Sequence, residues 1–149
     1  MKITLCGSIA FIDEMQSVKK QLEALGYEVE IPDPEVKGKN GEVILSKDLY
    51  ELRKNADGKN DWIWERNGEG MKSHLQKVAG TDAILVLNHH KNGINGYIGA
   101  NTFLEMGLAF HLNKKIYLLH PIPEAAYEEE VRGMNPSILN GDLDAIGNL

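Results

Sequence analysis

The stretch that decides the fold runs from residue 93 to residue 110 and has the sequence GINGYIGANTFLEMGLAF. It begins as a glycine-punctuated loop and continues as an apolar helix. The short apolar runs Ala83–Leu87 and Lys115–Leu119 on either side are typical of buried parallel strands. A strand, a glycine-rich turn, a helix and a second strand make a βαβ unit. Ligands of such sheets bind beyond the carboxyl ends of the strands, so we expect the loop 88–100 to border a ligand site.

Glu105 carries the only formal charge between Phe103 and Leu112. A helix that is apolar nearly all round is buried, and a buried carboxylate either finds hydrogen-bond donors or takes up a proton. Asn101 and Thr102 lie one turn earlier on the same face, and either could cap the helix. The helix dipole would then hold Glu105 ionised and poorly hydrated at a pocket floor, which suits a nucleophile. The alternative is an ordinary, partly exposed helix glutamate.

Composition sets limits on the class of protein. The 149 residues are 42% hydrophobic, enough for one domain with a core, and the formal charge is −6. No cluster of Lys or Arg exceeds a pair, which argues against a nucleic-acid polymer as partner. No apolar run approaches the roughly 20 residues of a membrane span. A single cysteine, Cys6, and a first strand that starts at the N-terminus fit a cytoplasmic protein without a signal peptide.

The order of the predicted elements indicates an α/β, flavodoxin-like (Rossmann-type) fold in three layers, with a mostly parallel sheet of about five strands. We expect one domain over residues 1–149, with a flap-like excursion at about 33–70. Within it, residues 35–45 are predicted to form a mobile loop, and Trp62 and Trp64 either close over a pocket or pin the loop to the core. The strands are expected at 2–6, 27–31, 83–87, 115–119 and 137–139, and the helices at 11–25, 45–55, 71–79, about 101–112 and 124–131.

Two further features bear on ligands. The turn Gly7-Ser8-Ile9 presents N–H groups and a hydroxyl at a helix start, an arrangement that binds anions, although it lacks the Lys and second Gly of a phosphate loop. Cys6 is expected to be a buried strand residue rather than a nucleophile. The pair His89-His90 suggests a metal, but adjacent loop residues rarely reach one ion. We therefore expect no bound metal and no cofactor, and we expect Asn88, directly after its strand, to contact ligand.

Several motifs, in their order and spacing, resemble the nucleoside 2-deoxyribosyltransferase superfamily, which includes the 2′-deoxynucleoside 5′-monophosphate N-glycosidases. They are Leu5–Ile9, Ala83–Asn88, Gly96–Gly99, Glu105–Ala109 and Lys114–Ile116. The resemblance implies a flavodoxin-like fold and cleavage or transfer of the N-glycosidic bond of a small-molecule nucleoside or nucleotide. It gives Glu105 the role of nucleophile at the sugar C1′, through an oxocarbenium-like state. It also implies that Gly7, Ser8 and Ile9 contact substrate, and that the protein is a homodimer or higher homo-oligomer.

The chain departs from that family at three positions. The helix before the third strand carries His74 where the family has an Asp, so we take His74 as a candidate general acid. Ala10 replaces an Arg and Gly99 replaces a second Ser, and both changes weaken the case for a phosphate. The remaining predicted substrate contacts are Tyr97, Gly99 and Asn101.

The sequence leaves alternatives open. A non-catalytic nucleotide-binding or sensor module on the same fold is the main one, supported by the missing phosphate and acid residues. A flavin carrier is less favoured, because the first turn lacks a Ser/Thr-rich phosphate loop. The base, the sugar, the need for a 5′-phosphate, and hydrolysis versus transfer all remain undecided.

Overall fold

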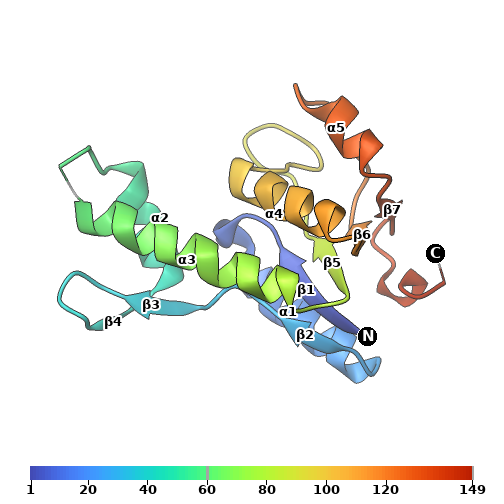
Figure 1. The fold of residues 1–149 in the computed structure, drawn as a ribbon, viewed down its shortest axis with the longest axis horizontal. Helices are drawn as coiled ribbons and strands as arrows, with labels where there is room; N and C mark the ends of the chain where they lie inside the picture. The colour runs from blue at the N-terminus through green and yellow to red at the C-terminus, as the bar shows by residue number, and fades with distance from the viewer. Residues whose placement is uncertain (60, 149) are drawn as a thin grey trace.

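The computed structural model describes residues 1–59 and 61–148 and contains a five-stranded sheet in the order β2-β1-β5-β6-β7 (Figure 1). Every neighbouring pair of strands in this sheet is parallel. The predicted flavodoxin-like fold class is confirmed, because this is the flavodoxin strand order, with the chain reversing direction across the sheet between β1 and β5. The strands are β1 Lys2–Cys6, β2 Glu28–Glu30, β5 Ala83–Val86, β6 Lys115–Leu118 and β7 Ser137–Ile138.

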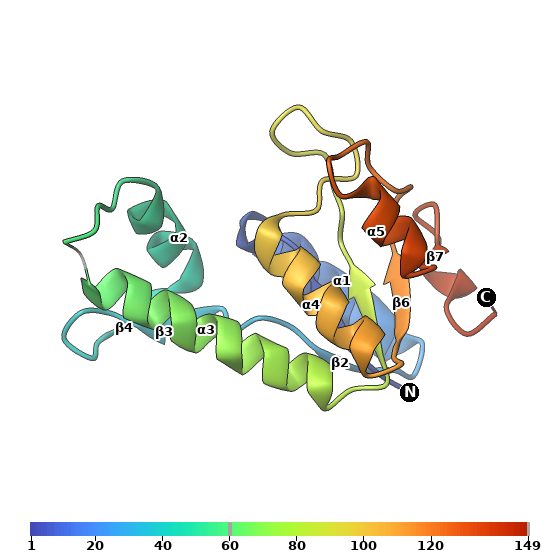
Figure 2. The same ribbon diagram turned by 45° about the horizontal axis from the view of Figure 1, so that its top comes forward.

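Helices cover both faces of the sheet (Figures 1 and 2). Helix α1 (Ile12–Ala24) packs on one face, and α3 (Asp61–Ala79), α4 (Ala100–His111) and α5 (Glu128–Gly133) pack on the other. Side chains alternate along a strand, so β1 sends Ile3 and Leu5 toward α1 and Cys6 toward α3 and α4. Cys6 is the last residue of β1, and its side chain therefore lies where α3 and α4 meet the carboxyl end of the sheet. No helix in the described part of the chain is long and apolar enough to cross a membrane.

The excursion between β2 and β5 is more regular than predicted. Strands β3 (Glu35–Lys37) and β4 (Val43–Leu45) form an antiparallel hairpin where a mobile loop was expected. After α2 (Ser46–Lys54), helix α3 starts at Asp61, ten residues before the predicted start at Met71, and includes both tryptophans. Gly68 and Gly70 lower helix propensity in this stretch, but packing against α2 and α4 keeps the helix continuous. Figure 1 shows the hairpin, α2 and the first half of α3 extending away from the sheet. Motion of this excursion as a flap stays a prediction.

Helix α4 also starts earlier than predicted. Its N-cap is Gly99, without a side-chain cap, and Ala100 is its first residue, so the expected cap at Asn101 or Thr102 is wrong. Glu105 is consequently the sixth residue of the helix and lies in the second turn. This shift matters because the favourable effect of the helix dipole on an anion is confined to the first turn.

Candidate active site

A cavity of about 420 Å³ lies beyond the carboxyl end of β1, on the face covered by α3 and α4. Its wall combines the turn after β1, helices α2, α3 and α4, and the loop that leads from β5 to α4. This is the topological switch point of the sheet, where ligands of such folds bind. Eight of the predicted site residues line it, namely Gly7, Ser8, Ile9, His74, Tyr97, Gly99, Asn101 and Glu105.

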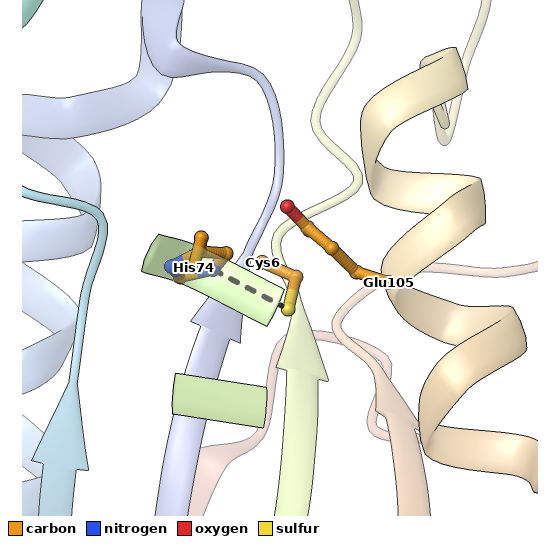
Figure 3. Close-up of side chains that lie close together, drawn as sticks. All are labelled: Cys6, His74 and Glu105. Atoms are coloured by element: carbon orange, nitrogen blue, oxygen red, sulfur yellow. Dashed lines mark hydrogen bonds between the residues drawn. The ribbon is translucent and has the colours of Figure 1, made fainter. Parts of the chain in front are cut away.

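Three side chains from different elements converge at the base of the cavity, where His74 and Glu105 line it and Cys6 lies buried beside them (Figure 3). Cys6 comes from the end of β1, His74 from α3, and Glu105 reaches toward both from α4. The Cys6 Sγ lies 3.7 Å from the His74 Nε2, and the sulfur, a ring nitrogen and a carboxylate oxygen all lie within 4.8 Å of one another. All three residues are buried, with Glu105 only 9% exposed. The sequence indicated Glu105 and His74 but gave no sign that Cys6 would lie beside them.

Burial dominates the electrostatics of Glu105. It raises the pKa of the carboxyl to about 8, against a smaller lowering by the Cys6 thiol. The Oε2 atom is buried and has no hydrogen-bond partner in the part of the chain that the structure describes. At pH 7 a carboxyl with this pKa is protonated in about nine molecules of ten. This pKa contradicts the expectation of a carboxylate held ionised. Glu105 lies past the first turn of α4, and its Oε2 accepts no hydrogen bond from the described residues, so little compensates its burial.

His74 is neutral at physiological pH. Its Nε2 lies 3.0 Å from the carbonyl oxygen of Leu5, which can only accept, so Nε2 carries the proton. The Nδ1 atom then has a free lone pair, and it is buried without a partner among the described residues. Burial is the main cause that lowers the pKa of His74 to about 4. A neutral imidazole with a free Nδ1 can accept a hydrogen bond from a ligand in the cavity, but it does not supply a proton at pH 7 as an imidazolium does.

Cys6 is held as a thiol. Cys6 is a buried strand residue, as expected. Burial, followed by the nearby Glu105, raises the pKa of the Cys6 thiol well above its usual range. Thiol, imidazole and carboxylate are also the ligand types that zinc prefers. Within residues 1–59 and 61–148, these three side chains are the group whose geometry could hold a metal ion. The side chains of His89 and His90 have different partners. The His89 Nδ1 lies 3.3 Å from the His120 Nε2, whereas the His90 Nδ1 lies 2.8 Å from the Asn95 Oδ1.

Asn88 does not line the cavity. Its side chain is completely buried, and its amide nitrogen lies 2.9 Å from the carbonyl oxygen of His120 and 3.2 Å from that of Pro121. Its carbonyl oxygen accepts the backbone N–H of His120 at 2.8 Å. Asn88 therefore ties the loop after β5 to the loop after β6, and its buried position does not support the prediction that it contacts ligand.

The loop from β5 to α4 is fixed by its turn residues. Asn92 and Gly93 have positive φ angles of 52° and 73°, and Lys91 and Ile94 exchange backbone hydrogen bonds of 3.1 and 2.9 Å. This is the geometry of a type I′ turn, which Asn-Gly favours. Gly96 has a φ of 71°, and a Cβ there would lie 2.6 Å from the carbonyl oxygen of Pro121, so only glycine fits. The loop thereby places the side chains of Lys91 and Tyr97 in the cavity wall.

Five residues that line the cavity and carry a charge or a phenol were not predicted from the sequence. They are Asp33, Tyr50, Arg53, Arg66 and Lys91. Tyr50 and Arg53 lie three residues apart on α2, which puts them on one helical face, but the sequence gives no sign that this face meets the turn after β1. The excursion thus contributes to the wall of the cavity.

Comparisons with known proteins give solved structures only, since no family model and no curated protein matches the chain. A 2-deoxyribosyltransferase from Bacillus psychrosaccharolyticus has 15% sequence identity over 80% of this chain and 72% of its own, with a TM-score of 0.48. The CMP N-glycosidase BcmB from Clostridium botulinum has 17% identity over 93% of this chain and 85% of its own, with a TM-score of 0.47. A conserved protein from Enterococcus faecalis V583 has 17% identity over 91% of this chain and 74% of its own, with a TM-score of 0.49.

Two of these three structures are of the kinds that the sequence motifs indicated, a 2-deoxyribosyltransferase and a nucleotide N-glycosidase. With identities below 20% and TM-scores below 0.5, the similarities decide neither the reaction nor the substrate of this chain. The strand order and the geometry of the cavity were described above without reference to these similarities.

Proposed function

We propose that this protein cleaves or transfers the N-glycosidic bond of a nucleoside or nucleotide, with Glu105 as nucleophile at the sugar C1′. The observation that carries the proposal is a buried carboxyl with no counterion among residues 1–59 and 61–148, projecting from α4 into a cavity at the switch point of the sheet. A carboxyl kept from water is costly to ionise, and it is stabilised when positive charge develops beside it. The motifs around Glu105 and the turn after β1 support the same assignment.

The reaction has two steps. The ionised Glu105 forms a bond to C1′ while the bond from C1′ to the base nitrogen breaks, and the electron pair of the broken bond leaves with the base, which takes a proton from water. In the second step the bond from C1′ to Glu105 breaks and the carboxylate is regenerated. Water that attacks C1′ gives up a proton to solvent and releases the sugar, whereas attack by a second base completes a transfer. Because Glu105 is largely protonated at pH 7, it must first lose its proton to solvent. His74, with its free Nδ1, is proposed to accept a hydrogen bond from substrate, and Ser8, Tyr97 and Asn101 to contact sugar or base.

The test is release of free base from a panel of ribo- and deoxyribonucleosides and their 5′-phosphates. Glu105→Gln removes the nucleophile with almost no change in shape, and Glu129→Gln, at an exposed position on α5, is the matched control. We expect the wild type and Glu129→Gln to release base from the same substrates, and Glu105→Gln to be slower by on the order of 1,000-fold. Equal rates for Glu105→Gln and the wild type would refute the role of Glu105.

A binding or sensor module is the second candidate. It is favoured by one specific observation, namely that both titratable groups that line the cavity floor, Glu105 and His74, are mainly neutral at pH 7. Thermal unfolding of the wild type with each compound separates the two functions. A rise in Tm with a nucleotide, without any free base after prolonged incubation, supports the module and contradicts the enzyme.

A further inference from the structure

The Cys6, His74 and Glu105 side chains together form a possible set of metal ligands. They come from β1, α3 and α4, and a sulfur, a ring nitrogen and a carboxylate oxygen lie within 4.8 Å of one another (Figure 3). Around a tetrahedral zinc ion such atoms lie about 3.3 to 3.6 Å apart, because the bonds to the metal are about 2.0 to 2.3 Å long. The Cys6 Sγ and the His74 Nε2, at 3.7 Å, nearly have this spacing already. The largest separation has to shrink by at most about 1.5 Å, which side-chain rotation can supply.

Two of these side chains carry polar atoms that the described part of the protein leaves unpaired. The Glu105 Oε2 and the His74 Nδ1 have no hydrogen-bond partner within residues 1–59 and 61–148, although the two residues are only 9% and 5% exposed. Buried polar atoms without a partner are costly and uncommon. A shift of the ring proton from Nε2 to Nδ1 would free the lone pair of Nε2 instead, so either nitrogen of His74 can bind an ion. The site therefore offers ligand atoms that have no other use in the fold.

The charges of the three groups suit a divalent cation. A thiolate and a carboxylate neutralise its two positive charges, and the imidazole adds a neutral ligand, so the bound ion brings no net charge into the buried site. On binding, the thiol and any protonated carboxyl release their protons to solvent. His74 and Glu105 line the cavity of about 420 Å³, which gives an ion access to the site and leaves room for a water molecule as fourth ligand.

The types of ligand decide which class of ion fits. Mg²⁺ and Ca²⁺ prefer sets of oxygen ligands, whereas a thiolate with an imidazole favours Zn²⁺ and the transition metals that resemble it. We propose that Cys6, His74 and Glu105 bind a zinc-class divalent cation, with the fourth coordination position open to the cavity. This site is distinct from the His89-His90 pair, whose two side chains have different partners.

Metal binding has a consequence for the proposed reaction. The Glu105 carboxylate cannot bind the ion and attack a sugar carbon at the same time. The metal-bound protein should therefore release no base, and a chelator should restore the activity. This consequence rests on the proposed function, whereas the metal site itself does not.

The test is titration of the reduced, metal-free protein with Zn²⁺, with Co²⁺ and, for comparison, with Mg²⁺. Cys6 is the only cysteine of the chain, so thiolate-to-cobalt charge-transfer absorption in the near ultraviolet can arise only from this residue and needs no variant. Calorimetry then compares the Zn²⁺ affinity of Cys6→Ser, His74→Gln and Glu105→Gln with that of the wild type. The control is His89→Gln, because the His89 Nδ1 lies 3.3 Å from the His120 Nε2 and these two rings form the rival site. Thermal unfolding identifies any variant that is not folded.

We expect one Zn²⁺ per chain, the thiolate-to-cobalt absorption, and no binding of Mg²⁺. Each of the three ligand variants should weaken Zn²⁺ binding by more than about 100-fold, since the loss of an outer-shell partner alone costs about 10- to 100-fold. His89→Gln should leave the affinity unchanged. Wild type without the cobalt absorption in excess Co²⁺ overturns the proposal. So does a folded ligand variant that retains full affinity, or an affinity that is lost in His89→Gln.

Base release measured with and without Zn²⁺ separates this proposal from the proposed function. Base release that requires Glu105, in a protein that binds no Zn²⁺, overturns the metal site alone. Base release that continues while the three ligands are saturated with Zn²⁺ instead overturns the role of Glu105 as nucleophile and leaves the metal site standing.

Discussion

Replacing Glu105 with glutamine tests whether this carboxyl is buried as the structure describes. Glutamine has nearly the same shape but cannot ionise, so the variant removes the proton equilibrium while leaving the packing of α4 against Cys6 and His74 in place. The size of the change in stability at one pH depends on which hydrogen bonds the new amide makes. The pH dependence of that change does not depend on them, and we therefore predict the pH dependence.

The magnitude follows from the shift in pKa. The carboxyl titrates at its ordinary pKa of 4.5 in the unfolded chain and at about 8 in the folded protein. The folded state therefore binds the proton more tightly, so the group costs nothing well below pH 4.5 and destabilises the fold progressively as the pH rises toward 8. With about 1.36 kcal/mol for each pKa unit, the wild type should lose roughly 3.5 kcal/mol relative to Glu105→Gln between pH 5 and pH 8. His74 titrates in both proteins, and Glu105 is not among the causes of its shift, so its effect cancels.

The assay is urea unfolding of both proteins, followed by far-UV circular dichroism at half-unit steps from pH 5 to pH 8. The difference in unfolding free energy should move steadily in favour of the glutamine variant across this range. A difference that stays constant within about 1 kcal/mol would mean that the carboxyl has an ordinary pKa and reaches water, which would refute the buried site. Glu129→Gln, on the surface, should show no such trend.

Three further outcomes are expected. If ionised Glu105 is the nucleophile, kcat/KM should rise up to tenfold per unit from pH 6 and level off above its pKa of about 8, and a profile that falls over this range would exclude the role. Asn88→Ala should lower the free energy of unfolding by about 3 kcal/mol, because three buried hydrogen bonds to the segment at His120 are lost. Urea unfolding measures this change. Unchanged stability together with weaker ligand binding would instead place Asn88 in the binding site. The protein should elute as a homo-oligomer in size-exclusion chromatography with light scattering. Phe110 lies on α4 with 52% of its surface exposed, and Phe110→Glu should shift the protein toward the monomer. A monomeric wild type would contradict the expectation.

The sheet could be predicted from sequence because its strands are short apolar runs at the spacing of βαβ units. The predicted bounds of two strands agree with the structure to within one residue, namely those of β5 (Ala83–Val86) and β6 (Lys115–Leu118). The excursion was harder, because Gly68 and Gly70 and the polar composition argue locally against a helix that packing supports. The hairpin at 35–45 lacks a strong alternating pattern, so nothing in its sequence indicated strands.

The candidate site was predictable in part for the same reason. Glu105 was found because one charge in an apolar helix is conspicuous, but its protonation depends on where α4 starts and on what covers it, which no local pattern reveals. The hydrogen bonds of Asn88 to the loop after β6 were not foreseen, because a position directly after a strand does not show which loop the side-chain amide meets. Lys91 and Arg53 were missed because their common neighbour, Tyr50, joins segments some 40 residues apart.

The two halves of the site are built on parts of the chain with different anchorage. Cys6 and Glu105 belong to the sheet and to a helix packed on it, whereas Tyr50, Arg53 and Arg66 belong to the excursion that projects beyond the sheet. Sequence changes in the projecting part can reshape the wall of the cavity without displacing the Glu105 carboxyl. For the proposed reaction, such an architecture would allow one chemistry to be matched with new substrates by remodelling a peripheral insertion alone.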